Sequence, residues 1–550
     1  MTGMGWVPVA LLAVPLLGAL GLVVFPYALR PVLRAYGLVL SGVTLALAAL
    51  LVVTFDHRRP AGPQFEVDVP WIPGLGLRFH LGIDGISLPL VALTALLTFL
   101  CFVYLSWGSA RATGQFLRAR PRALVFTLLV LEVGMIGTFL ALDLLLFFVF
   151  FEIVLVPMYF LIGVWGGEGR RAASVKFLLY TLLGSVVMLL GLLLVWAQTG
   201  TLDIEALAAA HGSGMARSVQ VVAFVAIGVG LAVKTPMWPL HTWLPDAHTE
   251  APTAGSVLLA GVLLKMGTYG FARIAIPVLP EGAVAVAPWL GAFAVVGIVY
   301  GALACLAQRD LKRMIAYSSV GHMGFVLLGF ATLTPTGING ALFANVAHGL
   351  ITGLLFFLAG AVRERYRTVD MTVLGGGLLA TLPRLGSVLT FASIASLGLP
   401  GLAGFWGEML ALLGAFRPAD GLPRGLFLTY MVIGGLGAVL TAAYFLVMLS
   451  RVTHGRPAAA EETPSGSVDD RLVGETPDER PVVPLGTEVA PGAAGRTAIL
   501  EPVLRTDDIR PYELLAWTPL VALILLFGLW PGLLLSLTTP AVQALLGAVS

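Results

Sequence analysis

Long apolar runs constrain this chain more than any other feature. Stretches of about 20 mainly apolar residues, the length that a helix needs to cross a ~30 Å hydrocarbon core, recur along the whole sequence. Hydrophobic residues make up 58% of the 550 residues, which is more apolar surface than one soluble core could bury. We therefore expect an all-α, polytopic membrane protein with about fourteen spans, which begin near residues 5, 33, 84, 122, 143, 172, 218, 253, 283, 312, 337, 383, 427 and 515.

The basic residues of the loops predict how these spans are oriented. Most loop arginines and lysines follow odd-numbered spans, among them Arg170, Lys312 and Arg363. Because cytoplasmic loops carry the excess of basic residues, we expect both termini to face outward. The net charge of +2 favours neither a nucleic-acid partner nor an acidic substrate.

Two regions do not have the composition of a membrane span. Residues 56–80 contain short alternating stretches and turn residues, which predict a small external hairpin. Residues 453–511 are rich in Pro, Glu, Asp and Gly, which predicts a polar, mobile cytoplasmic loop. The two cysteines, Cys101 and Cys305, lie in apolar runs without metal-ligand spacing, so we expect small core residues and no disulfide.

A weak internal repeat is also visible. Glu152 in span 5 precedes Lys234 in span 7 by nearly as many residues as His322 in span 10 precedes Glu408 in span 12. Two five-helix units that start from opposite sides of the bilayer are a common plan of transporters. The expected divisions are spans 1–3 with the hairpin (1–121), a first five-helix repeat (122–280), a second, inverted repeat (281–452), the polar loop (453–511) and span 14 (512–550).

Prolines predict a helix break in span 7 and another in span 12, each beside the second residue of a repeat pair, Lys234 or Glu408. The breaks are expected at Pro236 and Pro239 in span 7 and at Pro400 in span 12. Pro236 cannot donate a hydrogen bond to the carbonyl of Ala232. We expect the break to expose carbonyls beside Lys234, where they can hold water and allow movement.

Lysine is rare, because only four of the 32 basic residues are lysines. Two of them, Lys234 and Lys265, lie inside apolar spans. Arginine keeps its proton at any physiological pH, whereas a buried lysine can lose it. Lysine in these spans therefore indicates positions where a charge must come and go, with chance retention as the alternative.

Several ionisable residues are expected near the middle of the membrane. From the rise of an α-helix, Glu152 and His322 lie roughly 13 Å into their spans, Lys265 roughly 20 Å and His348 roughly 17 Å. An unpaired charge at this depth costs at least ~2.5 kcal/mol, so these groups need partners and water. Carboxylates, imidazoles and buried lysines can all exchange protons near neutral pH. We therefore predict a proton wire formed by Glu152, Lys234, Lys265, His322, His348 and Glu408.

Each member of this row also has a structural interpretation. Glu152 and Lys234 could form a static buried ion pair, and Lys265 could extend to the membrane surface. The two histidines could be hydrogen-bonded packing residues. Glu408 could cap the second half of a broken helix.

Four further residues are weaker candidates. For Glu132 in span 4 and Lys176 at the start of span 6, tuning of the row and simple placement at an interface are equally open. His241 and His248 lie near the membrane edge, where they could be structural or line a cytoplasmic entrance. No cysteine or carboxylate completes a metal site with these histidines, so we expect none.

Four long segments resemble one known family: FFVFFEIVLVPMYFLIGVWGG (147–167), KTPMWPLHTWLPDAHTEAPTAGSVLLAGVLLKMGTYG (234–270), RDLKRMIAYSSVGHMGF (309–325) and GLPGLAGFWGE (398–408). With them, nearly the whole chain is similar to the antiporter-like membrane subunits of respiratory complex I, the bacterial NADH-quinone oxidoreductase. Glutamate at position 408, where sister subunits usually have lysine, favours chain M.

The resemblance implies a role for each residue of the row. Glu152 and Lys234 would be the coupled input pair, Lys265 the central relay with His322 and His348 beside it, and Glu408 the terminal carboxylate. The chain would translocate protons across the bacterial inner membrane, driven by redox chemistry elsewhere.

The resemblance also implies partners and cofactors. This chain would hold no cofactor, and FMN, iron–sulfur clusters and quinone would lie in partner subunits. The partners would be other membrane and peripheral subunits of complex I, including sister antiporter-like subunits, together with membrane lipids. Two other functions stay open at this point: a subunit of a cation/proton antiporter, or a passive membrane spacer.

Overall fold

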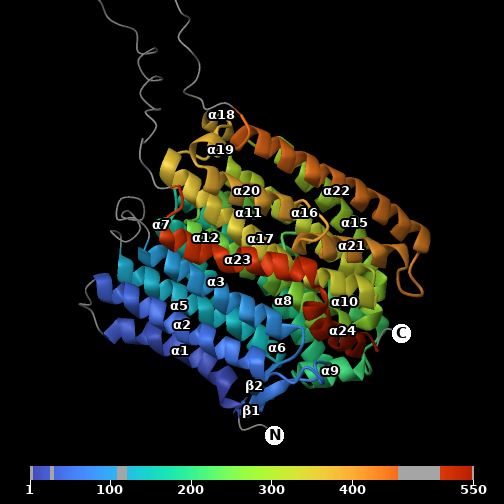
Figure 1. The fold of residues 1–550 in the computed structure, drawn as a ribbon. Coiled ribbons are helices and arrows are strands. Elements are labelled where there is room, and N and C mark those ends of the chain that lie inside the picture. Colours follow the sequence, from blue (N-terminus) through green and yellow to red (C-terminus); the bar gives the residue numbers. More distant parts are fainter. Residues whose placement is uncertain (1–3, 25–29, 108–119, 456–507, 548–550) are drawn as a thin grey trace, which may run out of the picture.

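The structure is a computed structural model that describes residues 4–24, 30–107, 120–455 and 508–547. In these ranges, thirteen helices are long and apolar enough to cross a membrane. They pack side by side in one bundle (Figure 1). The expected all-α membrane fold is therefore confirmed.

The first half of the chain supplies α1 (Trp6–Val24), α2 (Arg30–Thr54), α3 (Ser87–Trp107), α5 (Pro121–Leu140), α6 (Leu144–Ile153), α7 (Leu155–Trp165), α8 (Arg170–Thr199), the short α9 (Ile204–Ala210), α10 (Arg217–Lys234), the short α11 (Trp243–Glu250) and α12 (Thr253–Leu258). The segment that follows α12 comprises η2 (Leu259–Leu263), α13 (Leu264–Gly270), η3 (Phe271–Ala275) and α14 (Ile276–Val278).

The second half of the chain supplies α15 (Pro280–Leu306), α16 (Leu311–Ala331), α17 (Pro335–Tyr366), the short α18 (Met371–Leu374) and α19 (Leu378–Thr381), α20 (Pro383–Ser396), α21 (Ala403–Phe416), α22 (Arg424–Val452), α23 (Pro511–Leu529) and α24 (Gly532–Leu546). The run that begins near residue 383, expected among fourteen spans, is divided between α20 and α21. Each half is too short to count among the thirteen.

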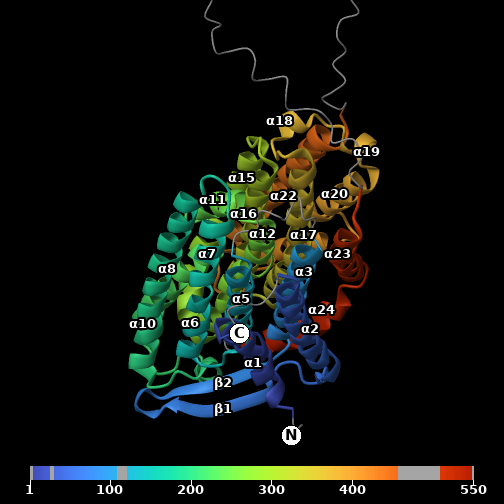
Figure 2. The same cartoon turned by 90° about the vertical axis from the view of Figure 1, so that its left-hand side faces the viewer.

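The expected hairpin is confirmed. Strand β1 (Gln64–Ile72) pairs antiparallel with β2 (Leu77–Ile83), and the turn between them contains a short 3₁₀ helix, η1 (Pro73–Leu75). Gly76 closes the turn with a φ of 68°, a conformation that glycine adopts without steric cost. The hairpin lies at one end of the helices, and α18 and α19 lie at the opposite end (Figure 2). Of the expected polar loop, residues 456–507 lie outside the described residues.

Both predicted helix breaks are present. Helix α10 ends at Lys234 and α11 begins at Trp243, so Pro236 and Pro239 lie between two half-helices. Helix α20 ends at Ser396 and α21 begins at Ala403, with Pro400 between them.

The expectation of a free carbonyl at Ala232 was wrong. The backbone turns back after Pro236, and the Met237 N–H donates to the Ala232 oxygen at 2.9 Å. The next carbonyl, of Val233, accepts a hydrogen bond of 3.0 Å from Nε1 of Trp243. The break near Lys234 is therefore a folded turn whose neighbouring carbonyls have protein partners.

A third interruption lies beside Glu152. The helix is interrupted at Val154, which lies between the end of α6 and the start of α7. Pro157, three residues further on, has no N–H to donate to the Ile153 carbonyl, which weakens the helix there. A titratable residue and a local loss of helical regularity again occur together.

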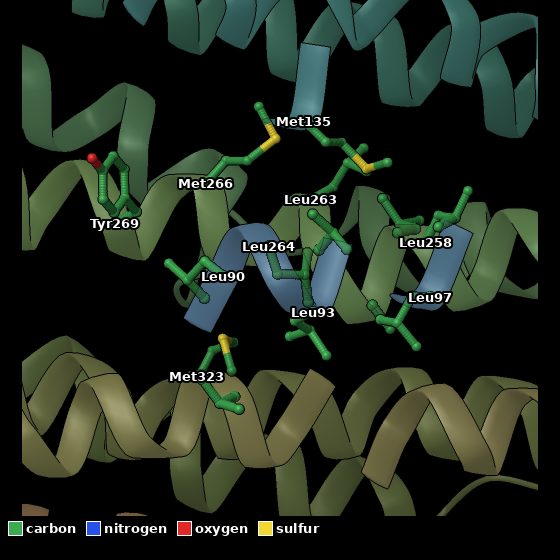
Figure 3. Packing of buried hydrophobic residues seen from close by; sticks show 14 of the residues in the cluster. Leu90, Leu93, Leu97, Met135, Leu258, Leu263, Leu264, Met266, Tyr269 and Met323 are labelled. Carbon is green, nitrogen blue, oxygen red and sulfur yellow. The ribbon is translucent and has the colours of Figure 1, made fainter. Parts of the chain in front are cut away.

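The helix that carries Lys265 is the most enclosed span of the bundle. Every residue in the most apolar window of Thr253–Val278 is buried inside the protein, whereas only 28% of the window in α2 is buried. Figure 3 shows leucines and methionines packed around it, including Leu90 and Leu93 of α3. It contains two π-helical segments, η2 and η3, an irregularity that is frequent at functional sites. Groups on this span therefore face protein on all sides.

Two matching backbone links support the inverted repeat. Asp143 pairs with Asp203 in an antiparallel bridge, and Asp310 pairs with Asp370 in the same way. All four aspartates also cap the helix that follows them by accepting backbone N–H bonds, at α6, α9, α16 and α18. Since α9 lies near the hairpin and α18 at the opposite end (Figure 1), the two links hold opposite ends of the bundle.

Candidate functional site

Lys265 and His348 form the centre of the site. Both side chains are buried, and Nζ of Lys265 lies 2.7 Å from Nδ1 of His348. Nζ also donates to the carbonyl of Ala260, which lies in the π-helical segment η2 one turn earlier. An ammonium group has no acceptor atom, so a protonated Lys265 makes Nδ1 of His348 the acceptor. This geometry allows a proton to pass directly between the two side chains.

His322 and Glu408 extend the row. Nδ1 of His322 lies 3.1 Å from Oε1 of Glu408, and its Nε2 lies 3.1 Å from the hydroxyl of Ser396. The rings of His322 and His348 meet edge to face with centroids 5.5 Å apart. Helices α16, α17 and α21, which carry these groups, all pack on one another. Four of the six predicted residues are therefore brought together.

A small cavity lies between these groups. It has a volume of about 20 Å³ and is lined by His322, His348, Thr352, Ser396 and Glu408 together with four small or apolar residues. A polar cavity of this size has room for about one water molecule. The cavity can thus bridge the gap between the two imidazole rings.

Lys234 lies at the end of α10, above the ring of Phe151, with Nζ 4.5 Å from the ring centroid. The Nζ atom is buried and has no hydrogen-bond partner among the described residues. Glu152 interacts with it electrostatically but does not form a direct ion pair. The interpretation as a static ion pair is therefore not supported. A lysine without a fixed partner can exist with or without its proton.

Two further structural interpretations are wrong. Lys265 cannot extend to the membrane surface, because its side chain is fully buried in the middle of the protein. Glu408 is not a helix cap, because Leu402 occupies the N-cap position of α21 and Glu408 lies in the second turn.

Lys234 and Lys265 lie on helices that approach each other closely. A Cβ atom at Gly267 would lie 2.7 Å from the carbonyl oxygen of Leu231, so a larger residue there would push α13 away from the end of α10. The glycine therefore keeps the two lysine-bearing segments in contact.

The weaker candidates have different surroundings. Glu132 on α5 is fully buried, and neither carboxylate oxygen has a partner in the described part of the chain. Lys176 forms a partly exposed ion pair of 2.7 Å with Asp246, which joins α8 to α11. His241 and His248 are both buried, and their rings contact Tyr300 and Phe356 respectively.

Sequence reasoning missed two buried cations. Lys312 was assigned to a basic loop, but it is the second residue of α16 and only 2% exposed. The rarity of lysine was the signal that could have found it. Arg273 in η3 is also buried and pairs with Asp84 at 2.8 Å. In the described residues, His, Cys, Asp and Glu side chains form no group of three that could hold a metal ion.

Known proteins resemble this chain over most of its length. A family model described as NADH:quinone oxidoreductase/Mrp antiporter, transmembrane, matches residues 141–441, which include all six residues of the row. NADH-quinone oxidoreductase subunit M of Rhodobacter capsulatus is 38% identical over 513 residues, which cover 92% of this chain and 88% of the relative.

The chain belongs to the NADH:quinone oxidoreductase/Mrp antiporter family. Another relative, chain 4 of the NADH-ubiquinone oxidoreductase of Arabidopsis thaliana, is 41% identical over 81% of this chain and 86% of its own length.

Chains in two solved structures have the same fold as this chain. A chain of respiratory complex I from Thermus thermophilus with bound NADH is 30% identical, with a TM-score of 0.79 over 99% of this chain and 100% of that one. A chain of the Mrp complex from Dietzia has a TM-score of 0.78 over 100% of both chains, but its identity of 23% shows only that the fold is shared. The resemblance found in the sequence is confirmed.

Proposed function

We propose that this chain is a proton-translocating membrane subunit of an NADH-quinone oxidoreductase. The observation that carries the proposal is the contiguous set Lys265, His348, His322 and Glu408, in which groups from four segments meet at hydrogen-bond distance or across one small cavity. A set of proton acceptors and donors inside a membrane protein is costly, and it is best explained by a task that needs it.

The row works as a relay of single protons. Lys265 gives a proton to Nδ1 of His348, and the imidazole releases the proton that it carries on Nε2. Water in the cavity takes this proton to His322, which becomes neutral again when Glu408 accepts a proton from Nδ1. Each imidazole then carries its proton on the other nitrogen, so it must regain its first tautomer before the next proton passes.

Glu152 and Lys234 control when the relay runs. A positive charge on Lys234 disfavours a positive charge on Lys265, because buried charges are weakly screened. Movement of Glu152 towards or away from Lys234 would change the charge on that lysine. Distant redox chemistry can thereby act on Lys265 without contact.

The setting follows from the family. The chain would lie in the inner membrane of a bacterium with both termini outward, beside other membrane and peripheral subunits of complex I, sister antiporter-like subunits and lipids. FMN, iron–sulfur clusters and quinone would lie in those partners. The two five-helix repeats, 122–280 and 281–452, would be its functional units, flanked by 1–121, 453–511 and 512–550.

A second candidate is a subunit of a cation/proton antiporter. The shared fold with a chain of the Mrp complex from Dietzia favours it. The first candidate is preferred, because relatives named as subunits of NADH-quinone oxidoreductases reach 38% identity over almost the whole chain.

Replacing Lys265 by arginine tests the relay. Arginine keeps the positive charge but does not release its proton. In assembled complexes reconstituted into vesicles, we expect Lys265→Arg to lower the ratio of protons pumped to NADH oxidised at least several-fold. Lys176→Arg is the matched control, since an arginine can still pair with Asp246. An unchanged ratio in Lys265→Arg would contradict the proposal.

A further inference from the structure

The ammonium group of Lys234 rests against an aromatic ring instead of an anion. Its Nζ lies 4.5 Å from the centroid of the Phe151 ring, and the two residues are only 2% and 1% exposed. Within the described residues, Nζ has no hydrogen-bond partner. The ring face is therefore the direct contact that remains to offset the burial of a charge at this place.

The backbone beside Lys234 is fixed, so the side chain is the part that can move. Each of the three carbonyls before it, at residues 231–233, accepts a hydrogen bond of 2.8–3.0 Å from a group further along the chain. The last of these donors is the indole N–H of Trp243, a fully buried residue. A lysine carries its charge on a flexible stem of four methylene groups. A displacement of this charge therefore comes from the stem and not from α10.

The two groups that can attract this ammonium are neighbours in the sequence. Phe151 and Glu152 occupy consecutive positions of α6, so their side chains point about 100° apart around the helix. The ring faces the interior, whereas Glu152 is half-buried. Glu152 acts on Lys234 electrostatically, without a direct ion pair in the described structure. One turn of α6 thus offers Lys234 an anionic seat and an aromatic seat, and the charge occupies the aromatic one.

An aromatic face distinguishes the two charge states of a lysine. The ring quadrupole attracts an ammonium group above it, whereas a neutral amine gains little at the same place. A carboxylate differs, because it can itself gain a proton and then loses its attraction. The ring has no proton to exchange. Its attraction for the ammonium therefore stays the same whatever the charge on Glu152 is.

A purely structural interpretation is that Phe151 only fills space. Its ring packs on Phe147 of the previous turn, with centroids 5.6 Å apart, and Phe147 in turn packs on Tyr269. Such packing explains a large apolar side chain at position 151. It does not explain why an ammonium without another direct contact lies over the ring face, where a buried charge is costly unless something compensates for it.

We propose that Phe151 is a positioning residue that provides a second, charge-selective seat for Lys234. The inference rests on the proposed function and deepens it. When Glu152 is charged and close, it draws the ammonium off the ring. When Glu152 turns away, the ring keeps a fraction of Lys234 charged, and this charge acts on Lys265. The ring therefore sets how strongly a change at Glu152 is passed on to the relay.

Fluorinated rings separate an electrostatic seat from a packing residue. Each ring fluorine withdraws electron density from the ring face and weakens its attraction for a cation, while the shape changes little. Phenylalanines with one, two and three ring fluorines are introduced at position 151 by suppression of a stop codon. In assembled complexes in vesicles, we expect the ratio of protons pumped to NADH oxidised to fall with each fluorine, by about three-fold or more over the series.

Phe147 is the matched control, because it is equally buried, lies one turn earlier on α6 and contacts other rings. The same fluorinated series at position 147 should leave the ratio unchanged. Phe151→Leu, which removes the ring but stays apolar, should lower the ratio at least as much as three fluorines do. A ratio that is independent of the number of fluorines at position 151, or that falls equally at position 147, would overturn the seat.

These tests distinguish a wrong seat from a wrong function. If Lys265→Arg stops pumping while the fluorinated series at position 151 pumps normally, the relay stands and Lys234 is held in another way. If Lys265→Arg itself pumps normally, the proposed function fails.

Discussion

The side chains of Lys265 and His348 touch, although 83 residues separate them along the chain. The contact joins the most enclosed span of the bundle, α12–α14, to the longest helix, α17. It also joins the two expected repeats, because Lys265 belongs to the first and His348 to the second.

His348→Gln should interrupt proton transfer between the two expected repeats. Glutamine is polar and similar in reach, but its amide does not carry a proton between donor and acceptor. We expect pumping per NADH oxidised to fall at least several-fold in assembled complexes, with NADH oxidation reduced less. Thr268→Val is the control, because it removes a hydroxyl that bonds Asn345 and the backbone carbonyl of Lys265 but leaves every side chain of the row in place. Equal losses in both variants would point to packing instead of proton transfer.

Glu152 and Lys234 should behave as one unit. Because each acts through the charge of the other, Glu152→Gln and Lys234→Ala should each lower pumping several-fold. The double variant should lose little more than either single variant. The measurement is the initial rate of vesicle acidification at equal amounts of assembled complex. Losses that multiply would show that the two residues act in separate steps.

The buried ion pair between Arg365 and Glu513 should hold α23 against α17. The guanidinium meets the carboxylate with two bonds of 2.8 and 2.6 Å, and the side chains are 2% and 0% exposed. Arg365→Met leaves a buried carboxylate without its partner, which should cost about 3–5 kcal/mol of stability. We expect a lower thermal transition of the purified complex or less assembled complex.

Arg78→Met provides the comparison for that variant. Its ion pair with Asp68 on the hairpin is exposed and screened by water, so its loss should cost far less stability than the loss of the buried pair. Similar effects of Arg365→Met and Arg78→Met would contradict the assigned importance of burial.

The hairpin should loosen at high pH because of His80. Burial opposes protonation of this histidine, but hydrogen bonds to Asp203 and Glu66 outweigh burial and raise its pKa to about 9. The protonated form therefore stabilises the hairpin fully below pH ~6.5, and this contribution is lost as the pH rises through about 9.

Hydrogen exchange of the hairpin amides checks this. At pH 7, His80→Gln should exchange faster than the wild-type complex at residues 64–83, and at pH 10 the two should exchange alike. A difference that persists unchanged at pH 10 would contradict a protonated His80.

The sequence predicts the framework of this protein well, because membrane spans depend on local composition. Apolar length alone placed the helices, and the prolines located the breaks in spans 7 and 12. Turn chemistry located the hairpin. The hydrogen-bond partner of the Ala232 carbonyl could not be predicted. It depends on how the chain turns after Pro236, which places the Met237 N–H beside that carbonyl.

The site was only partly predictable. Depth along each helix identified Glu152, Lys265, His322 and His348 as groups at similar levels, but only the packing of α13, α16, α17 and α21 shows which residues of the row touch. Lys312 was not predicted as a buried residue, because it lies at a helix start among basic residues that are typical of a cytoplasmic loop. Its burial results from tertiary packing, which a single sequence does not reveal.

The small volume between His348 and Glu408 has a consequence for selectivity. About 20 Å³ holds one water molecule, whereas a sodium ion with its hydration shell needs several times that space. A proton crosses such a gap by exchange of bonds, without any atom heavier than hydrogen passing through. If the row carries protons as proposed, the constriction would act in this conformation as a filter that passes protons and excludes hydrated metal cations.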